Sequence, residues 1–296
     1  MKIGVFLQVI DLESGAAVPV AELARRAAHA ERLGFDSVWV MDHFFVEWQG
    51  RRAFAHDPVV QLAAIAAGTQ RVQLGPLVLA APFRGPAQLA REAESLQDLS
   101  GGRLVLGLGA GWYQPEFEAA GISSDGLVGR FESTLEGVAR MLREGGVATR
   151  GGVPPPLWVA ASGPRMLRLA ARWADGWNTA WSGPDPAPFA AAVERLRTAL
   201  REVGRPEHEV TRSAGISVLP VEGEELEAAL ARARRFARHE RDLDFVQGGP
   251  RQVAAAIRAY ADAGAEHVIL SLSSSPVLAF DVSYLDRAAE ALALAR

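Results

Sequence analysis

The chain has 296 residues, of which 49% are hydrophobic, so it can bury one large core and a single domain over residues 1–296 is expected. The formal net charge is -4, with 31 Lys and Arg against 35 Asp and Glu, which excludes the basic surplus that nucleic acids and anionic membranes attract. The absence of cysteine excludes disulfides, thiolate metal sites and a cysteine nucleophile, so any redox chemistry must come from a cofactor. The strand-like run 3–7 follows Met1 closely and no apolar run approaches the ~20 residues of a membrane helix, so we expect a cytoplasmic protein without a secretory signal.

Short apolar runs rich in β-branched residues alternate along the chain with longer segments of helical period. Strands are predicted, in chain order, over residues 3–9, 37–41, 72–79, 104–108, 157–161, 175–178, 213–219 and 267–272. Helices are predicted over residues 20–33, 58–68, 86–99, 115–144, 187–203, 224–238, 250–263 and 284–295. Gly34 ends the first helix, and Asp57 followed by Pro58 caps the start of the second. The alternation predicts parallel strands joined by crossover helices.

Eight sequential strand–helix units favour an α/β protein, a single (β/α)8 TIM barrel with insertion loops at its C-terminal face. An open doubly wound sheet has the same local pattern and differs only in strand order, so it stays an alternative. The least regular stretches, residues 44–56, 145–156 and 243–249, are candidate loops over a site.

Asp42 and His43, the first candidate site residues, follow the second predicted strand. Catalytic groups in barrels stand at the carboxyl ends of strands. A histidine beside an aspartate can accept or donate a proton near neutral pH, and the neighbouring Phe44, Phe45 and Trp48 can form the wall of a planar ligand site. The alternative is a histidine that only hydrogen-bonds its loop, beside an aspartate that caps a turn. The place at a strand end favours the functional interpretation.

Two further strand ends carry candidate ligand contacts. The run 107–112 after the fourth strand contains three glycines, which let a ligand approach the backbone closely. The run 162–165 (SGPR) after the fifth strand opens a helix whose amides, together with a hydroxyl and a guanidinium, suit a phosphate group. An ordinary serine cap with a solvated arginine fits the same four residues equally well.

Several other chemistries lack their sequence motif. The histidines are scattered, and no His-x-x-x-His or Glu-x-x-His pair places two ligands on one helical face, so no metal site is expected. There is no Gly-x-Ser-x-Gly elbow for a serine hydrolase. The glycines after the fourth strand lack the spacing of a dinucleotide fingerprint, and no phosphate-binding loop with Gly-Lys-Ser/Thr is present.

Together and in chain order, these motifs resemble the bacterial luciferase-like superfamily, and within it the oxidoreductases that use the deazaflavin coenzyme F420. The likeness covers nearly the whole chain and implies a TIM barrel of the luciferase-like type. It rests on the runs 34–44 (GFDSVWVMDHF), 71–75 (RVQLG), 99–112 (LSGGRLVLGLGAGW), 160–164 (AASGP), 174–178 (ADGWN), 248–250 (GGP) and 263–268 (AGAEHV). The motifs are specific to the superfamily and less specific to the choice between deazaflavin and FMN.

The resemblance implies roles for individual residues. Asp42 and His43 match the Asp-His pair that lies against the cofactor ring, His43 as the catalytic histidine and Asp42 as a catalytic and cofactor-binding residue. Relatives often carry a non-prolyl cis peptide that presses on the ring, which by position would join Leu77 and Val78. The other implied cofactor contacts are Ala80 in the third strand, Ala110, Gly111 and Trp112 after the fourth, and, at the phosphate end, Ser162, Gly163, Arg165 and Met166.

One departure from the family pattern concerns the substrate. The sugar-phosphate dehydrogenases of this group carry a glutamate acid directly after the glycines of the fourth strand, where this chain has Trp112. A tryptophan makes the pocket narrower and more apolar, which points to a small, uncharged substrate, unsaturated or carbonyl-bearing. The resemblance thus implies hydride transfer between F420 and such a substrate, with His43 exchanging the accompanying proton, in a homodimer. From the charge and the apolar runs we expect neither nucleic acid nor a membrane as a partner.

Three alternative functions stay open from the sequence. The first is an FMN-dependent luciferase-like monooxygenase, which activates oxygen with flavin reduced by a separate reductase. The second is a non-catalytic flavin-binding protein, and the third is a barrel that processes phosphosugars without redox chemistry. The identity of the substrate and the direction of the reaction have no sequence signature, since the loops that select a substrate carry no transferable code.

Overall fold

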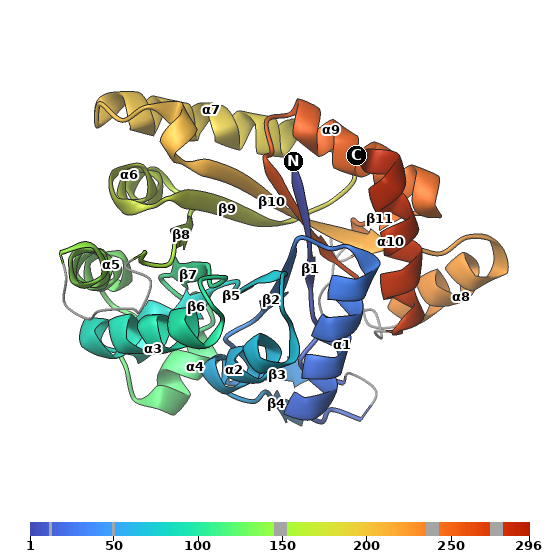
Figure 1. Ribbon diagram of the computed structural model, residues 1–296, viewed down its shortest axis with the longest axis horizontal. Helices are drawn as coiled ribbons and strands as arrows, with labels where there is room; N and C mark the ends of the chain where they lie inside the picture. Colours follow the sequence, from blue (N-terminus) through green and yellow to red (C-terminus); the bar gives the residue numbers. More distant parts are fainter. Residues whose placement is uncertain (12–13, 49–50, 145–152, 235–242, 273–280) are drawn as a thin grey trace.

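The computed structural model describes the chain except residues 12–13, 49–50, 145–152, 235–242 and 273–280, and a parallel sheet lies at its centre (Figure 1). Neighbouring strands follow the order β5-β2-β1-β12-β10-β9-β8-β7-β6, and each pairing along it is parallel. The strands are β1 (Lys2–Phe6), β2 (Ser37–Val40), β5 (Gln73–Pro76), β6 (Leu79–Ala80), β7 (Leu106–Gly109), β8 (Leu157–Ala160), β9 (Gly176–Ser182), β10 (Thr211–Leu219) and β12 (His267–Ser271).

The sheet closes through β5 and β6. These strands stand at the two ends of the pairing order, yet only Leu77 and Val78 separate them in the chain, so they form one interrupted barrel strand. On the β5 side, Leu74 bridges Leu104 in parallel, and the Val105 amide donates to the Leu74 carbonyl at 2.9 Å. The nine strand labels therefore make an eight-stranded barrel, which confirms the predicted architecture over the open doubly wound sheet.

Helices surround the barrel (Figure 1). They are α1 (Val20–Leu33), α2 (Pro58–Gly68), α3 (Pro86–Leu99), α4 (Gln114–Ala120), α5 (Leu127–Arg143), α6 (Pro164–Trp173), α7 (Ala187–Glu202), α8 (Gly223–Arg234), α9 (Pro250–Asp262), α10 (Ser283–Ala295), and the 3-10 turns η1 (Ala81–Phe83) and η2 (Glu207–Glu209). A short strand, β11 (Val246–Gln247), pairs with β10. Among the described residues, no helix combines the length and the apolar character that crossing a bilayer requires.

The predicted helix ends are confirmed where the cap chemistry is explicit. Gly34 follows α1 in the left-handed region, with φ of 92°, a conformation that glycine adopts without a Cβ clash. Asp57 precedes α2, and its Oδ1 atom accepts from the Val59 amide at 2.8 Å. Both helices press an apolar stripe onto the barrel, which in α1 includes Leu23 and Ala27.

Three segments differ from the sequence prediction, one of them the candidate loop 243–249, which contains β11. The stretch 44–56, expected to be an irregular loop, contains an antiparallel hairpin of β3 (Phe45–Trp48) and β4 (Arg51–Phe54). The helix expected over 115–144 is two helices, because Gly121 and Gly126 take left-handed conformations with φ of 66° and 65° between them. The predicted end of the helix at 235–238 and most of the candidate loop 145–156 lie outside the described residues.

Large side chains fill the barrel interior. Phe6, Trp39, Val105, Trp158 and Ile269 form a buried cluster separate from the core between strands and helices. The rings of Trp39 and Trp158 stack with their centroids 5.1 Å apart. The cluster makes the barrel a packed core, so a ligand can reach only the layers above it, at the carboxyl ends of the strands.

A buried histidine lies at the amino-terminal end of the same interior. Nε2 of His267 is 2.7 Å from the Ser37 hydroxyl, which also accepts a hydrogen bond from the Trp39 indole at 2.7 Å. Burial, with a smaller effect from the nearby positive charge of Lys2, lowers the pKa of His267 to about 3. The ring is therefore neutral at physiological pH, and we assign it a structural part in the barrel core.

Candidate active site

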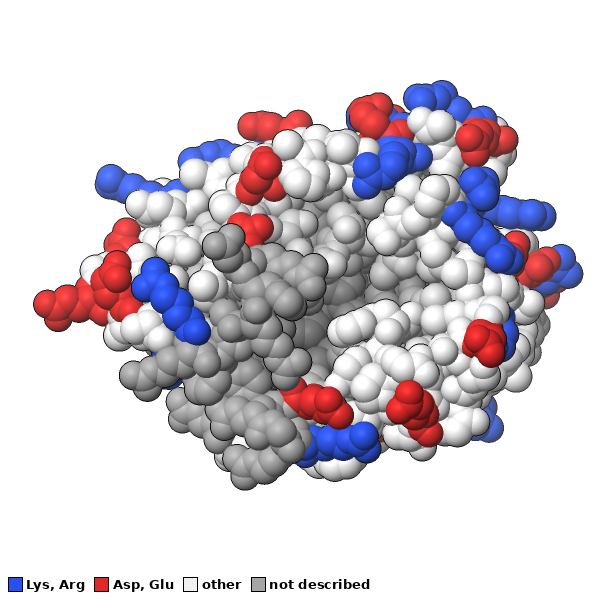
Figure 2. Space-filling view, turned by 180° about the vertical axis from the view of Figure 1, so that it is seen from behind, with Lys and Arg blue, Asp and Glu red and all other residues white. Residues whose placement is uncertain are grey.

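The carboxyl ends of the strands form one face of the barrel, which Figure 2 shows with a hollow near its centre. The described residues drawn around the hollow are mostly uncharged, and most of the charged side chains stand toward the margin of the face. An uncharged hollow flanked by polar groups is the usual setting of a small-molecule site.

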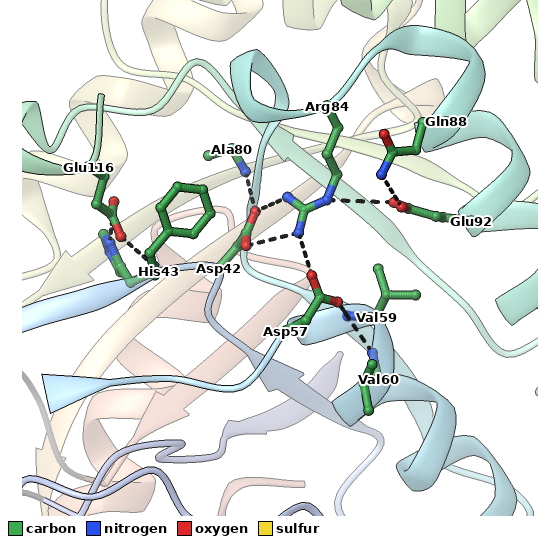
Figure 3. A network of polar contacts seen from close by, with 11 residues as sticks. Asp42, His43, Asp57, Val59, Val60, Ala80, Arg84, Gln88, Glu92 and Glu116 are labelled. Atoms are coloured by element: carbon green, nitrogen blue, oxygen red, sulfur yellow. Dashed lines mark hydrogen bonds and ion pairs between the residues drawn. The ribbon is translucent and has the colours of Figure 1, made fainter. Parts of the chain in front are cut away.

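Asp42 lies directly after β2, is 5% exposed, and is held by two neighbours (Figure 3). Its carboxylate accepts two hydrogen bonds from Arg84, at 2.5 and 3.2 Å, and one from the Ala80 amide at 2.9 Å. This buried bidentate pair fixes the orientation of the Asp42 carboxylate, so the carboxylate is poorly placed to act as a base. The structure thus shows Asp42 linking β2, β6 and the segment after η1, and its catalytic role stays a prediction. Its contact with a cofactor stays a prediction.

The Arg84 guanidinium lies close to three carboxylates (Figure 3). Besides its pair with Asp42, its Nη2 donates to Asp57 at 3.2 Å, and its Nε lies 3.6 Å from Glu92. Burial alone lowers the pKa of Arg84, but the hydrogen bond and charge of Asp42, with the charges of Asp57 and Glu92, outweigh it and raise the pKa above its ordinary value. The arginine stays cationic, and the surrounding carboxylates neutralise its charge toward any anionic ligand.

His43 is held by Glu116, a residue of α4 that is 3% exposed. Nδ1 of His43 lies 3.0 Å from Oε2 of Glu116, while Oε1 accepts from the Phe44 amide at 2.5 Å and the Phe45 amide at 3.4 Å. An ionised carboxylate only accepts hydrogen bonds, so it holds the ring hydrogen on Nδ1. This leaves Nε2 as the ring nitrogen for exchange of a proton with a ligand.

The peptide bond between Leu77 and Val78 is cis, as the resemblance implies. A Cβ at Gly109 would lie 2.5 Å from Cγ2 of Val78, and one at Gly107 would lie 2.2 Å from the Pro76 carbonyl oxygen and 3.1 Å from Cγ1 of Val78. These two glycines of β7 therefore make room for the neighbouring barrel strand, and their expected contact with a ligand stays a prediction.

The segment after β7 borders His43. Gly111 has φ of 76°, and a Cβ there would lie 2.9 Å from the Phe117 ring, so glycine is required by both backbone and space. Ala110 is half-buried beside it. The side chain of Trp112 is 77% exposed and its ring lies edge-on to His43, with centroids 5.8 Å apart. An exposed indole next to His43 offers an apolar surface to a ligand.

The turn after β8 leads into α6 through Gly163, the residue before the first helical turn. No side chain among the described residues caps this helix end, so the ordinary serine cap is not formed and the first-turn amides remain for an anion. Ser162 is exposed and Met166 is half-buried. Arg165 pairs with Glu132 at 2.7 Å on the exposed surface.

The three turns meet at one mouth. Asp42 binds the Ala80 amide, and Ala80 pairs in register with Gly109. A Cβ at Gly109 would lie 3.9 Å from Cβ of Ala160, the last residue of β8. The ends of β2, β6, β7 and β8 thus adjoin one another, and His43 stands on the same face of the barrel. That these residues bind a cofactor stays a prediction.

Sequence reasoning missed Arg84 and Glu116, the residues that hold Asp42 and His43. Glu116 carried a local signal, an acidic residue in the first turn of a helix that opens with a proline after a strand. Arg84 carried none, since its main partner is 42 residues away in the chain.

Other parts of the described structure are weaker candidates for a metal or ligand site. The described residues hold no group of three His, Asp or Glu side chains placed to bind a metal ion. A cavity of about 230 Å³ lies at the amino-terminal end of the barrel, and its charged side chains, Arg143 and Asp175, pair with each other at 2.9 Å. The mouth is therefore the candidate active site.

Comparison with known proteins agrees with this architecture. An F420-dependent glucose-6-phosphate dehydrogenase from Kineococcus radiotolerans is 30% identical in an alignment of 292 positions that covers 84% of this chain and 86% of that protein. The F420-dependent tetrahydromethanopterin reductase of Methanopyrus kandleri superposes with a TM-score of 0.77 at 19% identity, over 100% of this chain and 99% of that one. A monooxygenase from Streptomyces bottropensis superposes with a TM-score of 0.76 at 23% identity, over 99% of this chain and 98% of that one. At these identities the two solved structures show a shared fold.

The family model described as luciferase-like monooxygenase matches residues 1–244, which is most of the chain. This match covers the strands β1 to β10 and the mouth residues Asp42, His43 and Glu116. The chain belongs to the luciferase-like monooxygenase family.

Proposed function

We propose that the protein is an oxidoreductase that transfers hydride between coenzyme F420 and a small, uncharged organic substrate. The observation that carries the proposal is the His43–Glu116 pair at the mouth of a luciferase-like barrel. The choice of F420 is supported by the relative named F420-dependent glucose-6-phosphate dehydrogenase, whose alignment covers 84% of this chain. A histidine with one nitrogen held and the other facing a site suits the proton exchange that accompanies hydride transfer.

The residues at the mouth fit a flat cofactor with an anionic tail. The described residues around the hollow are mostly uncharged (Figure 2), and α6 directs first-turn amides without a side-chain cap toward the same face. Bound F420 supplies the ring carbon that accepts or gives up the hydride. The residues that would hold it are Asp42, Leu77, Val78, Ala80, Ala110, Gly111 and Trp112 around the ring, and Ser162, Gly163, Arg165 and Met166 near the tail.

In this proposal the chain positions its ligands and handles a proton. His43 gives or takes the proton at Nε2, and Glu116 keeps the hydrogen on Nδ1 during the exchange. Asp42 does not exchange protons; with Arg84 it fixes the segment from which Ala80 reaches the mouth. Trp112 covers the site beside His43 and keeps its surroundings apolar.

An uncharged substrate agrees with the charges at the mouth. Arg84 is paired with Asp42, Asp57 and Glu92, and Arg165 with Glu132. Neither arginine is placed to bind a substrate phosphate without giving up a carboxylate partner. This favours substrates without a phosphate, in contrast to the glucose 6-phosphate in the name of the relative from Kineococcus.

A binding titration tests the choice of cofactor. Purified protein is titrated with oxidised F420 and, separately, with FMN, and the fluorescence of each cofactor is followed. The proposal expects saturable quenching of F420 at cofactor concentrations on the order of micromolar, the range in which enzymes commonly bind their ligands. Tight binding of FMN with none of F420 would replace the proposal with its alternative.

That alternative is an FMN-dependent monooxygenase. It is favoured by the family description and by the superposition on the monooxygenase from Streptomyces bottropensis. Oxygen consumption separates the two, since a monooxygenase consumes oxygen with each substrate turned over and an F420-dependent reductase works under anaerobic conditions. A protein that binds the cofactor but turns over no acceptor in either assay would be a flavin carrier.

Assembly and location stay predictions. A homodimer is proposed from the resemblance, and two large apolar side chains, Phe54 and Val60, are exposed on β4 and α2. Light scattering of the purified protein distinguishes a dimer from a monomer, and fractionation of the native host tests the cytoplasmic location.

A further inference from the structure

Gln8, two residues beyond the end of β1, carries a polar atom that the fold leaves unpaired. The residue is 8% exposed, and its Oε1 atom has no hydrogen-bond partner among the residues that the structure describes. Buried amide oxygens almost always have a partner, so an exception calls for a water, an ion or a ligand. Gln8 takes no part in the His43–Glu116 pair or in the Arg84 network.

The alternation of side chains along β1 directs Gln8 into the barrel mouth. Phe6 belongs to the interior cluster, whereas Leu7 and Val9 pack in the core between strands and helices. The Leu7 amide still donates to the Trp39 carbonyl at 2.8 Å, so the extended geometry continues past Phe6. Since successive residues of a strand point to opposite faces, Gln8 points inward, one layer above Phe6.

Two serines lie on the next two strands of the barrel, at the level of Phe6 and one inward position below Gln8. Phe6 pairs in register with Ser271 on β12, which in turn pairs with Ser217 on β10. Ser271 lies two residues after Ile269 of the interior cluster and so shares its inward direction, and both serines are buried. Gln8, Ser217 and Ser271 are here called the polar mouth cluster. It offers hydroxyl groups and an amide, and no charge.

A flat aromatic surface borders the polar mouth cluster. The Trp181 ring lies edge-on to Phe6 with centroids 4.9 Å apart. A Cβ at Gly215, the inward position before Ser217 on β10, would lie 2.8 Å from this indole, so the ring covers the strand there. Trp181 is 39% exposed, and part of its surface is therefore open to a ligand.

We propose that the polar mouth cluster binds one edge of a planar, uncharged ligand. This edge carries an N–H and a carbonyl group, as an amide does. An N–H of the edge donates to Oε1 of Gln8, its carbonyl oxygen accepts from the Ser217 or Ser271 hydroxyl, and its flat body packs on Trp181. A carboxylate or a phosphate dianion only accepts hydrogen bonds and would leave Oε1 unpaired. The edge belongs to the pyrimidine ring of a bound deazaflavin or flavin, or to the substrate, and the inference rests on the proposed function.

The test compares Gln8→Met with wild-type protein. Methionine keeps the length of the side chain and removes its hydrogen bonds, and Gln70→Met, at an exposed site after α2, is the matched control. We expect Gln8→Met to lower the affinity for one ligand about tenfold, which is the effect of one lost hydrogen bond. We also expect this variant to unfold at an equal or higher Tm, because an unpaired buried group is removed. The double variant Ser217→Ala and Ser271→Ala, which removes both candidate hydroxyl donors, should lower the affinity for the same ligand and keeps the inference testable if Gln8→Met does not fold.

Two measurements distinguish the source of the edge. A tenfold lower affinity for the cofactor, measured by fluorescence titration, assigns the edge to the cofactor ring. An unchanged cofactor affinity together with a tenfold higher KM for the substrate assigns the edge to the substrate. Wild-type affinity and wild-type KM in both variants overturn the inference. Wild-type protein that binds neither F420 nor FMN overturns the proposed function, and this inference with it.

Discussion

Glu116 holds two neighbours at once, the imidazole of His43 and the backbone that follows it. We expect Glu116→Gln to lower kcat about ten- to a hundredfold, because a hydrogen bond to a charged group contributes about 1.5–3 kcal/mol and an amide is a poorer acceptor for Nδ1–H. The cofactor dissociation constant should hardly change, since Glu116 is buried behind His43. Steady-state kinetics and cofactor titration of the same preparation check the prediction.

Glu118→Gln is the matched control for this change. Glu118 lies on the same short helix but is exposed and bonds only to the Gln114 amide among the described residues, so its loss should leave kcat as it is. Glu116→Asp should recover part of the lost rate, because it restores the charge. If Glu116→Gln turned over as fast as wild type, Glu116 would be a purely structural residue.

A single residue, His267, also makes the free energy of unfolding depend on pH. Its pKa is about 3 in the folded protein against 6.5 for the exposed side chain, so below pH 6.5 the unfolded chain takes up a proton that the folded one does not. The stabilisation is complete above pH 6.5 and is lost as the pH falls toward 3, by about 1.4 kcal/mol per unit, or about 2 kcal/mol between pH 6.5 and 5. Denaturant unfolding at the two values measures it.

The contribution of His267 is separated from other titrating groups by substitution. His267→Gln should lose less stability than wild type between pH 6.5 and 5, although it is less stable at pH 7. His208→Gln, at an exposed site in η2, should follow the wild-type profile. Parallel profiles for wild type and His267→Gln would mean that the ring is already protonated in the folded protein.

At the scale of elements, Arg84 fastens the segment after η1 to the end of β2. Arg84→Met should destabilise the protein by about 3–5 kcal/mol, because it leaves the buried Asp42 carboxylate without its partner. Asp57→Asn removes the exposed partner of the same arginine and keeps a capping side chain for α2, so it should cost less than about 1 kcal/mol. Equal losses in the two variants would contradict the view that the Asp42 pair is the one that matters.

The fit of β7 against Val78 gives a second prediction at this scale. Gly109→Ala places a methyl group 2.5 Å from Cγ2 of Val78, and overpacking of this kind typically costs about 1–3 kcal/mol. We expect lower stability and weaker cofactor binding, both partly restored by adding Val78→Ala. Gly85→Ala, where a Cβ would meet nothing within 4 Å, is the control. Gly109→Ala with wild-type stability and affinity would show that Val78 can move aside without consequence.

The elements themselves were largely predictable, because each depends on residues close in the chain. Apolar runs bounded by turn residues marked all eight barrel strands, and Gly34 and the Asp57–Pro58 pair marked helix ends. The β3–β4 hairpin was missed, since its stability comes from cross-strand pairing and from the aromatic contact of Phe45 with Phe54. Arg84 and Glu116 were missed as site residues because their partners come from distant segments.

At the scale of the whole molecule, barrel closure brings separate turns to one mouth. The sheet closes only because β5 and β6 belong to one strand, and this places the ends of β2, β7 and β8 next to one another. The packed interior beneath them, with Trp39 and Trp158, leaves the carboxyl-end face as the place for a ligand. The sequence predicted the barrel and the motifs at its strand ends, whereas the contacts that hold Asp42 and His43 required the fold.

The most direct test of this account is the identity of the cofactor that the protein retains. The protein is produced in a host that makes both F420 and FMN and purified without added cofactor, and the bound molecule is released by denaturation and identified by its absorption spectrum and mass. We expect F420 in wild-type protein and in Gly85→Ala, and a smaller amount of it in Gly109→Ala. Release of FMN alone would contradict it and identify the protein as a flavin-dependent member of the family.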